Sequence, residues 1–384
     1  MNGARAISLL NADIDGRRSS LRLLGGHIEE VGAAPDAADL VVDLRGDRLL
    51  PGLINAHDHL SLNDHPRTRF RERHHNISEW IRDIDSRRHS DPVLAACEKV
   101  PRNLRLLRGA LKNLLCGATT VAHHDPAYAS MYTADFPVRV PRNYRWSHSL
   151  GIDGDTSVRD ACDATPADSP WIIHAGEGVD AAARAEFARL EGLGCIRANT
   201  VLVHGVAFEA AHLERLAAAG GALAWCPGSN FFLFGRTADV TPLICARAVM
   251  VGSDSRLSGE NDLLCELGLA AAHAPSLAAR LTDMVTCDAA RLLRLDDRGA
   301  LRRGLLADCI VLPAGMPLHD ARRVDLRAVI VGGELRYGDR DYAAAFDSGA
   351  RMAPVVIDGV SKCLDAALVA ALPAQGPQTH WRAA

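Results

Sequence analysis

Short apolar runs that end in a polar residue recur through the middle of this 384-residue chain, and helical stretches follow them. Repeated βα units produce this alternation, so it favours an α/β fold with a parallel sheet. Seven such runs can be counted, one short of the eight strands of a closed (β/α)8 TIM barrel. They span residues 49–55, 119–124, 144–148, 171–174, 201–204, 222–226 and 249–254.

Both ends of the chain carry a second pattern, in which β-like runs with a period of two are joined by turn residues. Gly25-Gly26 joins two runs near the start, and Gly332-Gly333 joins two runs near the end. The two half-sheets can combine into one small composite β-sandwich domain. The predicted units are that domain at residues 1–50 plus 297–345, the barrel at 51–296, and a C-terminal tail at 346–384.

Composition limits the classes of function. Hydrophobic residues make up 48% of the chain, charged residues 23%, and the formal net charge is −4. These are globular values without a commitment to nucleic acid or an anionic membrane, so a small molecule is the expected partner. The ten cysteines form no C-x-x-C pair, which predicts reduced thiols and a cytoplasmic protein. No run of about 18 uncharged apolar residues predicts a membrane span.

The polar ends of the apolar runs carry the chemistry. Five of the seven runs end on His or Asp. Because the carboxyl ends of barrel strands lie on one face, these residues should share one mouth. His57 and His59 are two positions apart, so on an extended strand both imidazoles point to the same side and can chelate a metal. A solvated, histidine-rich turn is the alternative for an isolated pair of this kind.

Further polar residues at strand ends strengthen the metal interpretation. His174 follows an apolar run, and Glu177, three residues later, can face the same pocket. His204 and Asp254 end two later runs. A single His or Asp at a strand end is more often a hydrogen-bonded polar group without a catalytic role. Their occurrence together and in this order predicts an active site.

With these motifs the sequence resembles the amidohydrolase superfamily, which includes adenosine, cytosine and guanine deaminases, imidazolonepropionase and the triazine hydrolases. The supporting segments are LPGLINAH at 50–57, GATTV at 117–121, CPGSN at 226–230 and GLLAD at 304–308. The resemblance implies a distorted (β/α)8 barrel with a small composite β domain. It also implies a set of metal ligands, with His204 beside the water: His57, His59, His174 and Asp254.

The lysines indicate how many metals to expect. Binuclear members of the superfamily bridge two metals with a carboxylated lysine after the fourth strand, and none of Lys99, Lys112 and Lys362 lies at a plausible position. We therefore expect one divalent metal. Nitrogen and oxygen ligands favour zinc, with iron as the alternative.

The ligand types suggest a mechanism. A divalent metal can lower the pKa of a bound water from 15.7 to about 7. Asp254 can take the proton of that water, His204 can orient it, and Glu177 is the expected general acid. For Glu177 the structural alternative is a carboxylate favoured by a helix N-terminus.

Three functions are consistent with this site. The first is an aminohydrolase, or deaminase, that releases ammonia from a nitrogen heterocycle. The second is a ring-opening hydrolase of cyclic amides or amidines that resembles imidazolonepropionase. The third, a barrel scaffold without catalysis, is disfavoured because the full ligand set is present. The sequence does not identify the substrate, and it leaves a homodimer as an open alternative.

Substrate contacts are predicted from loop positions. Residues 63–81 lie where the first βα loop would cover the mouth, and Trp80 is the best candidate there because its ring can stack on a planar substrate. The other candidates are His123, Ser229, Asn230 and Arg256. One irregularity is expected, because only 47 positions separate His124 from Trp171. Two further βα units need roughly 60, so the third or fourth strand should be abbreviated.

Overall fold

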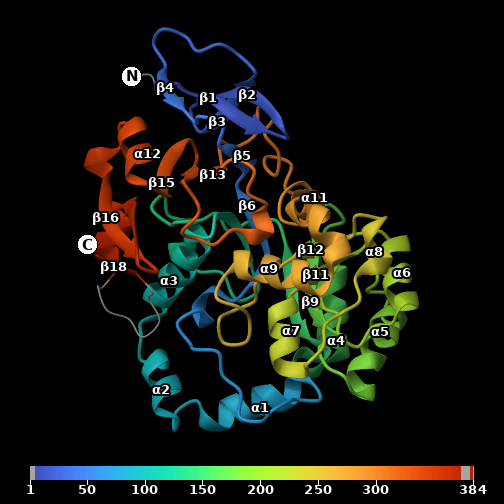
Figure 1. Ribbon diagram of the computed structural model, residues 1–384. Coiled ribbons are helices and arrows are strands. Elements are labelled where there is room, and N and C mark those ends of the chain that lie inside the picture. Colours follow the sequence, from blue (N-terminus) through green and yellow to red (C-terminus); the bar gives the residue numbers. More distant parts are fainter. Residues whose placement is uncertain (1–4, 373–380, 384) are drawn as a thin grey trace.

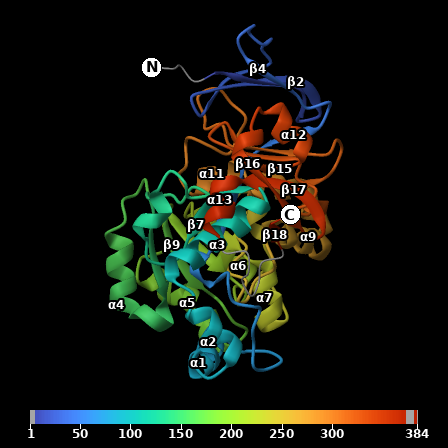
Figure 2. The ribbon, with the colours of Figure 1, turned by 90° about the vertical axis from the view of Figure 1, so that its left-hand side faces the viewer.

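The computed structural model describes residues 5–372 and 381–383, which form two regions built on different sheets. One region contains an eleven-stranded sheet, and the other contains parallel strands covered by helices (Figure 1). The first strands of the chain lie at one end of the molecule in both ribbon views. Helices α1 (Ile77–Arg87) and α2 (Pro92–Glu98) lie at the opposite end (Figure 2).

Strands from both ends of the chain share the eleven-stranded sheet. β5 (Arg48–Pro51) joins the two halves, because it pairs with β1 (Ile7–Ile14) in parallel and with β13 (Cys309–Leu312) in antiparallel register. Residues 352–365, which lie in the predicted C-terminal tail, form two strands of this sheet. The division of the chain into domains stays a prediction. The other members are β2 (Arg17–Leu24), β3 (His27–Val31), β4 (Leu40–Asp43), β14 (Ala328–Val331), β15 (Glu334–Gly338), β16 (Met352–Ile357), β17 (Val360–Asp365) and β18 (Trp381–Ala383).

The parallel strands form two ladders. A five-stranded ladder has the order β12-β11-β10-β9-β8, and a two-stranded ladder pairs β6 with β7. Every residue of β6, β7 and β9 to β12 is buried, as expected for parallel strands with both faces covered. The strands are β6 (Leu53–Asp58), β7 (Ala118–His123), β8 (Arg145–Ser149), β9 (Trp171–Ala175), β10 (Thr200–His204), β11 (Ala222–Trp225) and β12 (Val249–Val251).

Helices follow most of these strands, as the βα pattern predicts. Several begin at a side-chain cap: the carboxylate of Asp180 accepts the amide of Ala183 at the start of α5, and Asp262 does the same for Cys265 at the start of α9. Besides α1 and α2, the α-helices are α3 (Arg102–Leu115), α4 (Leu150–Asp163), α5 (Ala181–Gly192), α6 (Ala210–Ala218), α7 (Pro227–Phe234), α8 (Thr241–Ile244), α9 (Leu263–His273), α10 (Leu281–Met284), α11 (Cys287–Leu292), α12 (Arg340–Ala345) and α13 (Ala366–Ala371).

The distorted (β/α)8 barrel predicted from the sequence is not confirmed as a closed barrel, because the helix-covered strands of the described residues form one ladder of five and one of two. The irregularity lies between β7 and β8, where residues 125–143 contain a single 3-10 turn and no α-helix. In place of a strand there, Arg139 bridges the β7 residue Thr120 in parallel. The segment is too short for a full βα unit, as its length predicts.

β6 and β12 approach each other closely, which brings the first and last strand ends together. The amide of Asp254 donates to the carbonyl of His57 at 3.0 Å. A Cβ atom on Gly252 would lie 2.7 Å from the Cβ of His57, so this position has no room for a side chain. The contact sets the distance between two of the predicted ligands.

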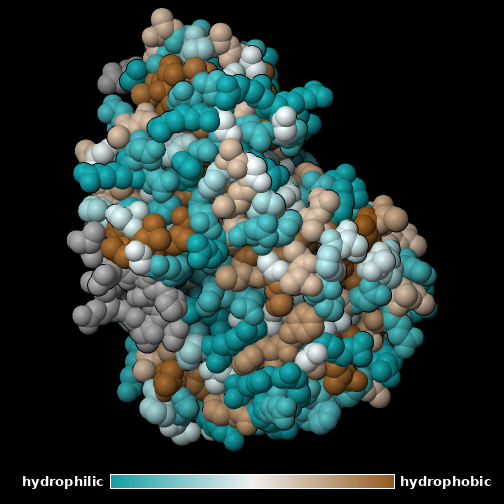
Figure 3. Space-filling view, in the orientation of Figure 1, coloured by the Kyte–Doolittle hydropathy of each residue, from teal (hydrophilic) through white to brown (hydrophobic). Residues whose placement is uncertain are grey.

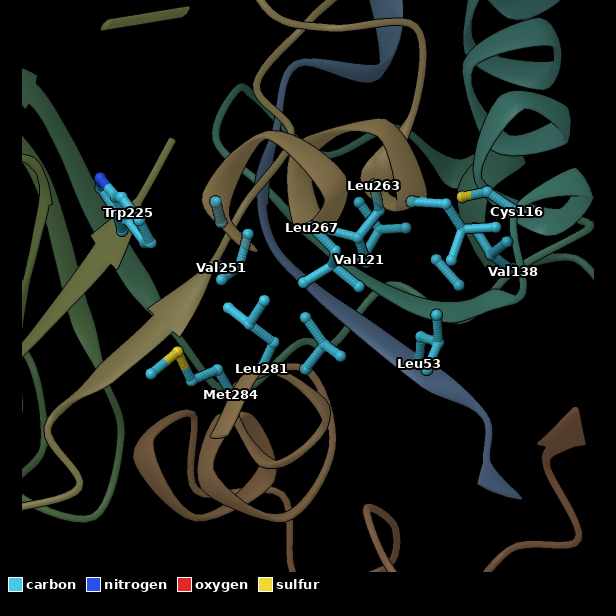
Figure 4. Packing of buried hydrophobic residues seen from close by; sticks show 14 of the residues in the cluster. Leu53, Cys116, Val121, Val138, Trp225, Val251, Leu263, Leu267, Leu281 and Met284 are labelled. Carbon is cyan, nitrogen blue, oxygen red and sulfur yellow. The ribbon is translucent and has the colours of Figure 1, made fainter. Parts of the chain in front are cut away.

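The largest hydrophobic core lies between the parallel strands and their helices. Leu53 of β6, Val121 of β7 and Val251 of β12 are fully buried in it. Leu263 and Leu267 of α9 pack over the same strands (Figure 4). The packing covers one side of the strands whose ends carry the polar site.

The surface face in Figure 3 is mostly hydrophilic, with apolar residues in small groups. Within residues 5–372 and 381–383, no helix is long and apolar enough to cross a membrane.

Candidate metal centre and active site

Four side chains from three strand ends meet at one point. His57 lies in β6, His59 directly after it, His174 in β9, and Asp254 three residues after β12. The Nε2 atom of His174 lies 3.3 Å from the Nε2 atoms of both His57 and His59. Oδ1 of Asp254 lies 3.8 Å and 3.9 Å from the same two nitrogens. The structure thus brings together the four ligands predicted from the sequence.

These spacings fit a four-coordinate metal. Imidazole nitrogens about 2.0–2.1 Å from zinc at the corners of a tetrahedron lie roughly 3.4 Å apart. The observed separations of 3.3 to 3.9 Å are close to that value. All four side chains are buried. Neutral imidazole lone pairs that face one another in a buried site repel unless a proton or a cation lies between them.

Two of the imidazoles are held by partners on their outer nitrogens. Nδ1 of His174 donates to the carbonyl of His148 at 2.8 Å, and Nδ1 of His59 faces Oδ2 of Asp125 at 3.1 Å. Each bond places a hydrogen on Nδ1, so the neutral form of the imidazole presents the lone pair of Nε2 inward. This is the usual outer-sphere arrangement of a histidine that binds a metal.

The third imidazole is held by another histidine. Nε2 of His124 contacts the carbonyl of Ser147 at 2.9 Å, and because a carbonyl only accepts, this nitrogen carries a hydrogen. Nδ1 of His124 is therefore an acceptor, and it lies 3.3 Å from Nδ1 of His57. His57 must donate from Nδ1, which leaves its Nε2 free to bind a metal.

This hydrogen-bond chain also decides which histidines can be ligands. Nitrogens of His57, His124 and His174 lie within 4.8 Å of one another, so by distance alone His124 could belong to the ligand set. Both of its nitrogens are already used, however, one by Ser147 and one by His57. His124 is therefore an outer-sphere residue, and His59 supplies the third imidazole.

Burial and charge set the protonation of the site. Burial, reinforced by the neighbouring histidines, lowers the pKa of both His57 and His174 well below the ordinary value. Burial acts in the same direction on His59, but Asp125 and Asp254 outweigh it and raise its pKa to about 9. In the metal-free protein His59 is therefore the imidazole that carries a second proton, on Nε2.

Glu177 and His204 face each other beside the ligands. Oε1 of Glu177 lies 3.4 Å from Nε2 of His204. Burial, with Asp254 and Glu186 nearby, raises the pKa of Glu177 well above its ordinary value, which favours the protonated carboxyl. Nδ1 of His204 contacts Oδ1 of Asn230 at 2.9 Å, and burial lowers its pKa. Burial thus favours the neutral form of both side chains.

The backbone is unusual at two of these residues. His204 has φ 75° and Asp254 has φ 52°, a region that residues other than glycine rarely adopt. Strain of this kind is common at functional sites. The carboxylate of Asp254 is held by the hydroxyl of Ser258 at 2.9 Å and by the amide of Ser255.

Lys112 lies beneath the site but does not face the ligand atoms. Its buried ammonium donates to the side chains of Asn63 and Ser253 and to the carbonyl of Asp254, at 2.8 to 3.1 Å. It also pairs with Asp58 at 3.1 Å. The ammonium therefore fixes the turn at Asp254 from below.

A cavity of about 180 Å³ opens over the ligands. Glu177 and His204 line it, and so does Trp80. Ser229 and Asn230 are buried in α7 outside it, although Asn230 contacts His204.

The remaining two predicted substrate contacts lie away from the cavity. Nδ1 of His123 accepts the amide of Leu60 at 3.2 Å, so its ring faces the strand end and not the pocket. The amide of Arg256 donates to Asn63, and its side chain contacts Asn261. Sequence reasoning missed Asp125 and His148, and it left the role of His124 undecided. The signal was the tripeptide His123-His124-Asp125 at a strand end.

A family model described as the amidohydrolase family matches residues 93–336, well over half of the chain. The chain belongs to the amidohydrolase family. It is therefore a hydrolase of carbon–nitrogen bonds other than peptide bonds. The matched residues include His174 and Asp254, while the first two proposed ligands precede them.

Two named relatives match this amidohydrolase over most of their own length. A 5-methylthioadenosine/S-adenosylhomocysteine deaminase of Nitratidesulfovibrio vulgaris (strain DP4) is 25% identical, over 79% of this chain and 82% of its own. A protein of the same name from Syntrophobacter fumaroxidans is 26% identical, over 86% and 92%.

Solved structures show the same fold. The atrazine chlorohydrolase of Arthrobacter aurescens TC1, complexed with zinc, superposes with a TM-score of 0.71 at 20% identity, over 86% of this chain and 94% of its own. An adenosine deaminase from Xanthomonas campestris with bound zinc gives 0.67 at 19% identity, over 91% and 97%. This amidohydrolase has a TIM-barrel-like α/β fold with a second domain.

Proposed function

We propose that this amidohydrolase is a deaminase that uses one zinc ion to replace an amino group of a nitrogen heterocycle with oxygen from water, releasing ammonia. The observation that carries the proposal is the meeting of three inward imidazole nitrogens and one carboxylate oxygen beside the buried carboxyl of Glu177, whose pKa is raised by burial. The names of the relatives support the deaminase assignment, and the two zinc-bound structural neighbours support the metal.

His57, His59, His174 and Asp254 would hold the metal, which supplies a water molecule acidic enough to react near neutral pH. Iron is the alternative metal, because imidazole and carboxylate ligands bind both.

The chain's own groups would move the protons. Burial would raise the pKa of Asp254, but the neighbouring His59 and His204 hold it below the ordinary value, so the carboxylate is ionised and can accept a proton from water. Glu177 enters the reaction protonated and can donate its proton to a ring nitrogen of the substrate. His204 can accept a hydrogen bond through Nε2, since its Nδ1 is used by Asn230.

The balance of the reaction distinguishes the two catalytic hypotheses. A deaminase consumes one water and releases one ammonia for each substrate molecule. A cyclic-amide hydrolase consumes one water and opens the ring, and it releases no ammonia. The same four ligands and Glu177 can serve both reactions, so product analysis has to separate them.

The test is a panel of amino-substituted purines, pyrimidines and triazines together with cyclic amides, assayed with the metal-loaded enzyme for ultraviolet absorbance change and for ammonia. We expect stoichiometric ammonia from at least one ring class, and loss of that activity in Glu177→Gln with the metal retained. Turnover of a ring compound without ammonia would replace the deaminase with the ring-opening hydrolase. No turnover of amino-heterocycles or cyclic amides would contradict both.

A further inference from the structure

One wall of the active-site cavity is apolar and is built by a single helix. Ile77, Trp80, Ile81 and Ile84 of α1 all line the cavity. Their spacing of i, i+3, i+4 and i+7 is that of one helix face, and this face is directed into the cavity. The opposite face carries charged residues, among them Asp83, which pairs with Arg71. The same cavity is lined by Glu177, His204 and the proposed ligands His59, His174 and Asp254.

The start of α1 is fixed to the segment that carries Glu177. The amide of Ile77 donates to the carbonyl of Glu177 at 3.0 Å, and the amide of Val179 donates to the carbonyl of His75 at 2.7 Å. Gly178 allows this approach, because a Cβ there would lie 2.7 Å from the carbonyl oxygen of His75. The first turn of the wall is therefore placed by the catalytic loop itself.

The wall is also tied to the loop after β12. The indole NH of Trp80 donates to the carbonyl of Thr68 at 2.9 Å, and the amide of Thr68 donates to the carbonyl of Leu257 at 2.9 Å. Leu257 lines the cavity as well. Hydrogen bonds to both flanking loops therefore hold α1 in place as a wall of the pocket.

Apart from Ser255 and Ser258 in the loop after β12, and a charged pair at the C-terminal end of α1, the polar groups that line the cavity are proposed ligands and residues beside them. Asp125, His148, Glu177 and His204 line the cavity close to the proposed ligands. At the other end Arg88 is already shared by two carboxylates, at 2.7 Å from Oδ1 of Asp85 and 2.8 Å from Oε1 of Glu98.

The size of the cavity limits what can fill it. Its volume is about 180 Å³. An apolar cavity of about 150 Å³ accepts a benzene molecule, so this one accepts a single ring system with a short substituent. Trp80, Ile81 and Ile84 line the same cavity as Glu177, so the part of a substrate that extends along α1 meets an apolar surface.

We propose that the substrate of this site is an amino-heterocycle with a compact apolar substituent, which packs against the α1 wall, and not a ring with a polyhydroxylated or charged tail. This inference rests on the proposed deamination. It separates the chain from the nucleosides that name its relatives. Each methylene buried on the wall should raise kcat/KM roughly fourfold. A hydroxyl placed there without a partner should lower it roughly tenfold.

The test compares matched substituents on one ring. Each amino-purine, amino-pyrimidine and amino-triazine is offered with a propyl or a 2,3-dihydroxypropyl group on a ring atom other than the carbon that bears the departing amino group, which itself stays unsubstituted, and ammonia release gives kcat/KM for both. We expect the propyl form to be preferred at least tenfold on any ring that is turned over. Equal rates, or preference for the diol, would overturn the wall inference and leave the deaminase intact. Absence of ammonia from every compound would overturn both.

A pair of helix-compatible variants tests the wall itself. Ile84→Gln and Ile84→Met introduce unbranched side chains of similar size, one polar and one apolar. We expect the propyl-to-diol ratio to fall several-fold in Ile84→Gln and to stay near the wild-type value in Ile84→Met. The ratio is measured on one preparation, so it does not depend on the fraction of folded enzyme. Val93→Ser, at an exposed apolar residue of α2, is the control, and equal ratios in both Ile84 variants would contradict the proposal.

Discussion

Replacement of His124 by leucine should weaken metal binding although His124 is not a ligand. In the wild-type protein His57 donates from Nδ1 to His124, which fixes the tautomer that presents Nε2 to the metal. Leucine has a similar size but offers no acceptor. Loss of an outer-sphere partner typically costs 10- to 100-fold in metal affinity. This corresponds to about 1.4–2.7 kcal/mol of binding free energy.

The asparagine variant provides the matched control. Both His124→Leu and His124→Asn lose the bond to the carbonyl of Ser147, which costs folding free energy, roughly 1–3 kcal/mol, with and without metal. Because that cost is common to the metal-free and metal-bound protein, it cancels from the dissociation constant. Only asparagine restores an acceptor for Nδ1 of His57.

The assay is competition with a chromophoric zinc chelator at fixed pH, with melting of the metal-free variants as the folding check. We expect the zinc Kd to rise 10- to 100-fold in His124→Leu and to return close to the wild-type value in His124→Asn. A wild-type Kd in the leucine variant, or equal weakening in both, would refute the tautomer argument.

Four further outcomes are expected. His57→Ala should abolish turnover and stoichiometric metal while leaving the far-ultraviolet circular dichroism unchanged; retained activity would contradict the ligand assignment. Glu177→Gln should keep the metal, measured by elemental analysis, and lose roughly two to four orders of magnitude in kcat, because only the proton donor is removed. The pKa of His59 is about 9 without metal, and a ligand must be neutral, so zinc binding at pH 7.5 should release about one proton and log Kd should fall as pH rises towards 9. Calorimetry in buffers of different ionisation enthalpy measures the number of protons released. Zinc binding without proton release would be inconsistent with this pKa. Gly178→Ala should lower stability by roughly 1–3 kcal/mol, since the added Cβ meets the carbonyl of His75, and an unchanged denaturation midpoint would show that α1 can move away.

The strand ends and the four converging side chains could be predicted because they depend on a rule that holds for all parallel α/β folds. Carboxyl ends of parallel strands meet, so His57, His174 and Asp254 must approach one another wherever the helices lie. The missing regular unit between β7 and β8 was also readable, since the number of residues from His124 to Trp171 is too small for it.

The outer sphere and the pocket wall depend on details that one sequence does not contain. The bond from His174 to His148 requires the register between β8 and β9. The bond from His57 to His124 requires the register between β6 and β7, which shifts between Asn55 and Asp58. The predicted contact of Arg256 with the substrate stays a prediction, while the amide of Arg256 donates to Asn63 after the left-handed turn at Asp254.

The sequence alone also could not predict that the apolar face of α1 lines the cavity. Its apolar spacing predicts an amphipathic helix, but not whether the apolar face covers a core or a cavity. The bonds from Ile77 to Glu177 and from Trp80 to Thr68 decide this in the folded chain.

The account depends above all on one metal bound by the four converging side chains. Zinc titration of the metal-free enzyme, with activity measured at each addition, tests this directly. We predict that ammonia-releasing activity rises in proportion to zinc and reaches its limit at one ion per chain. Saturation at two ions, or full activity in the metal-free protein, would contradict the assignment of a mononuclear catalytic site.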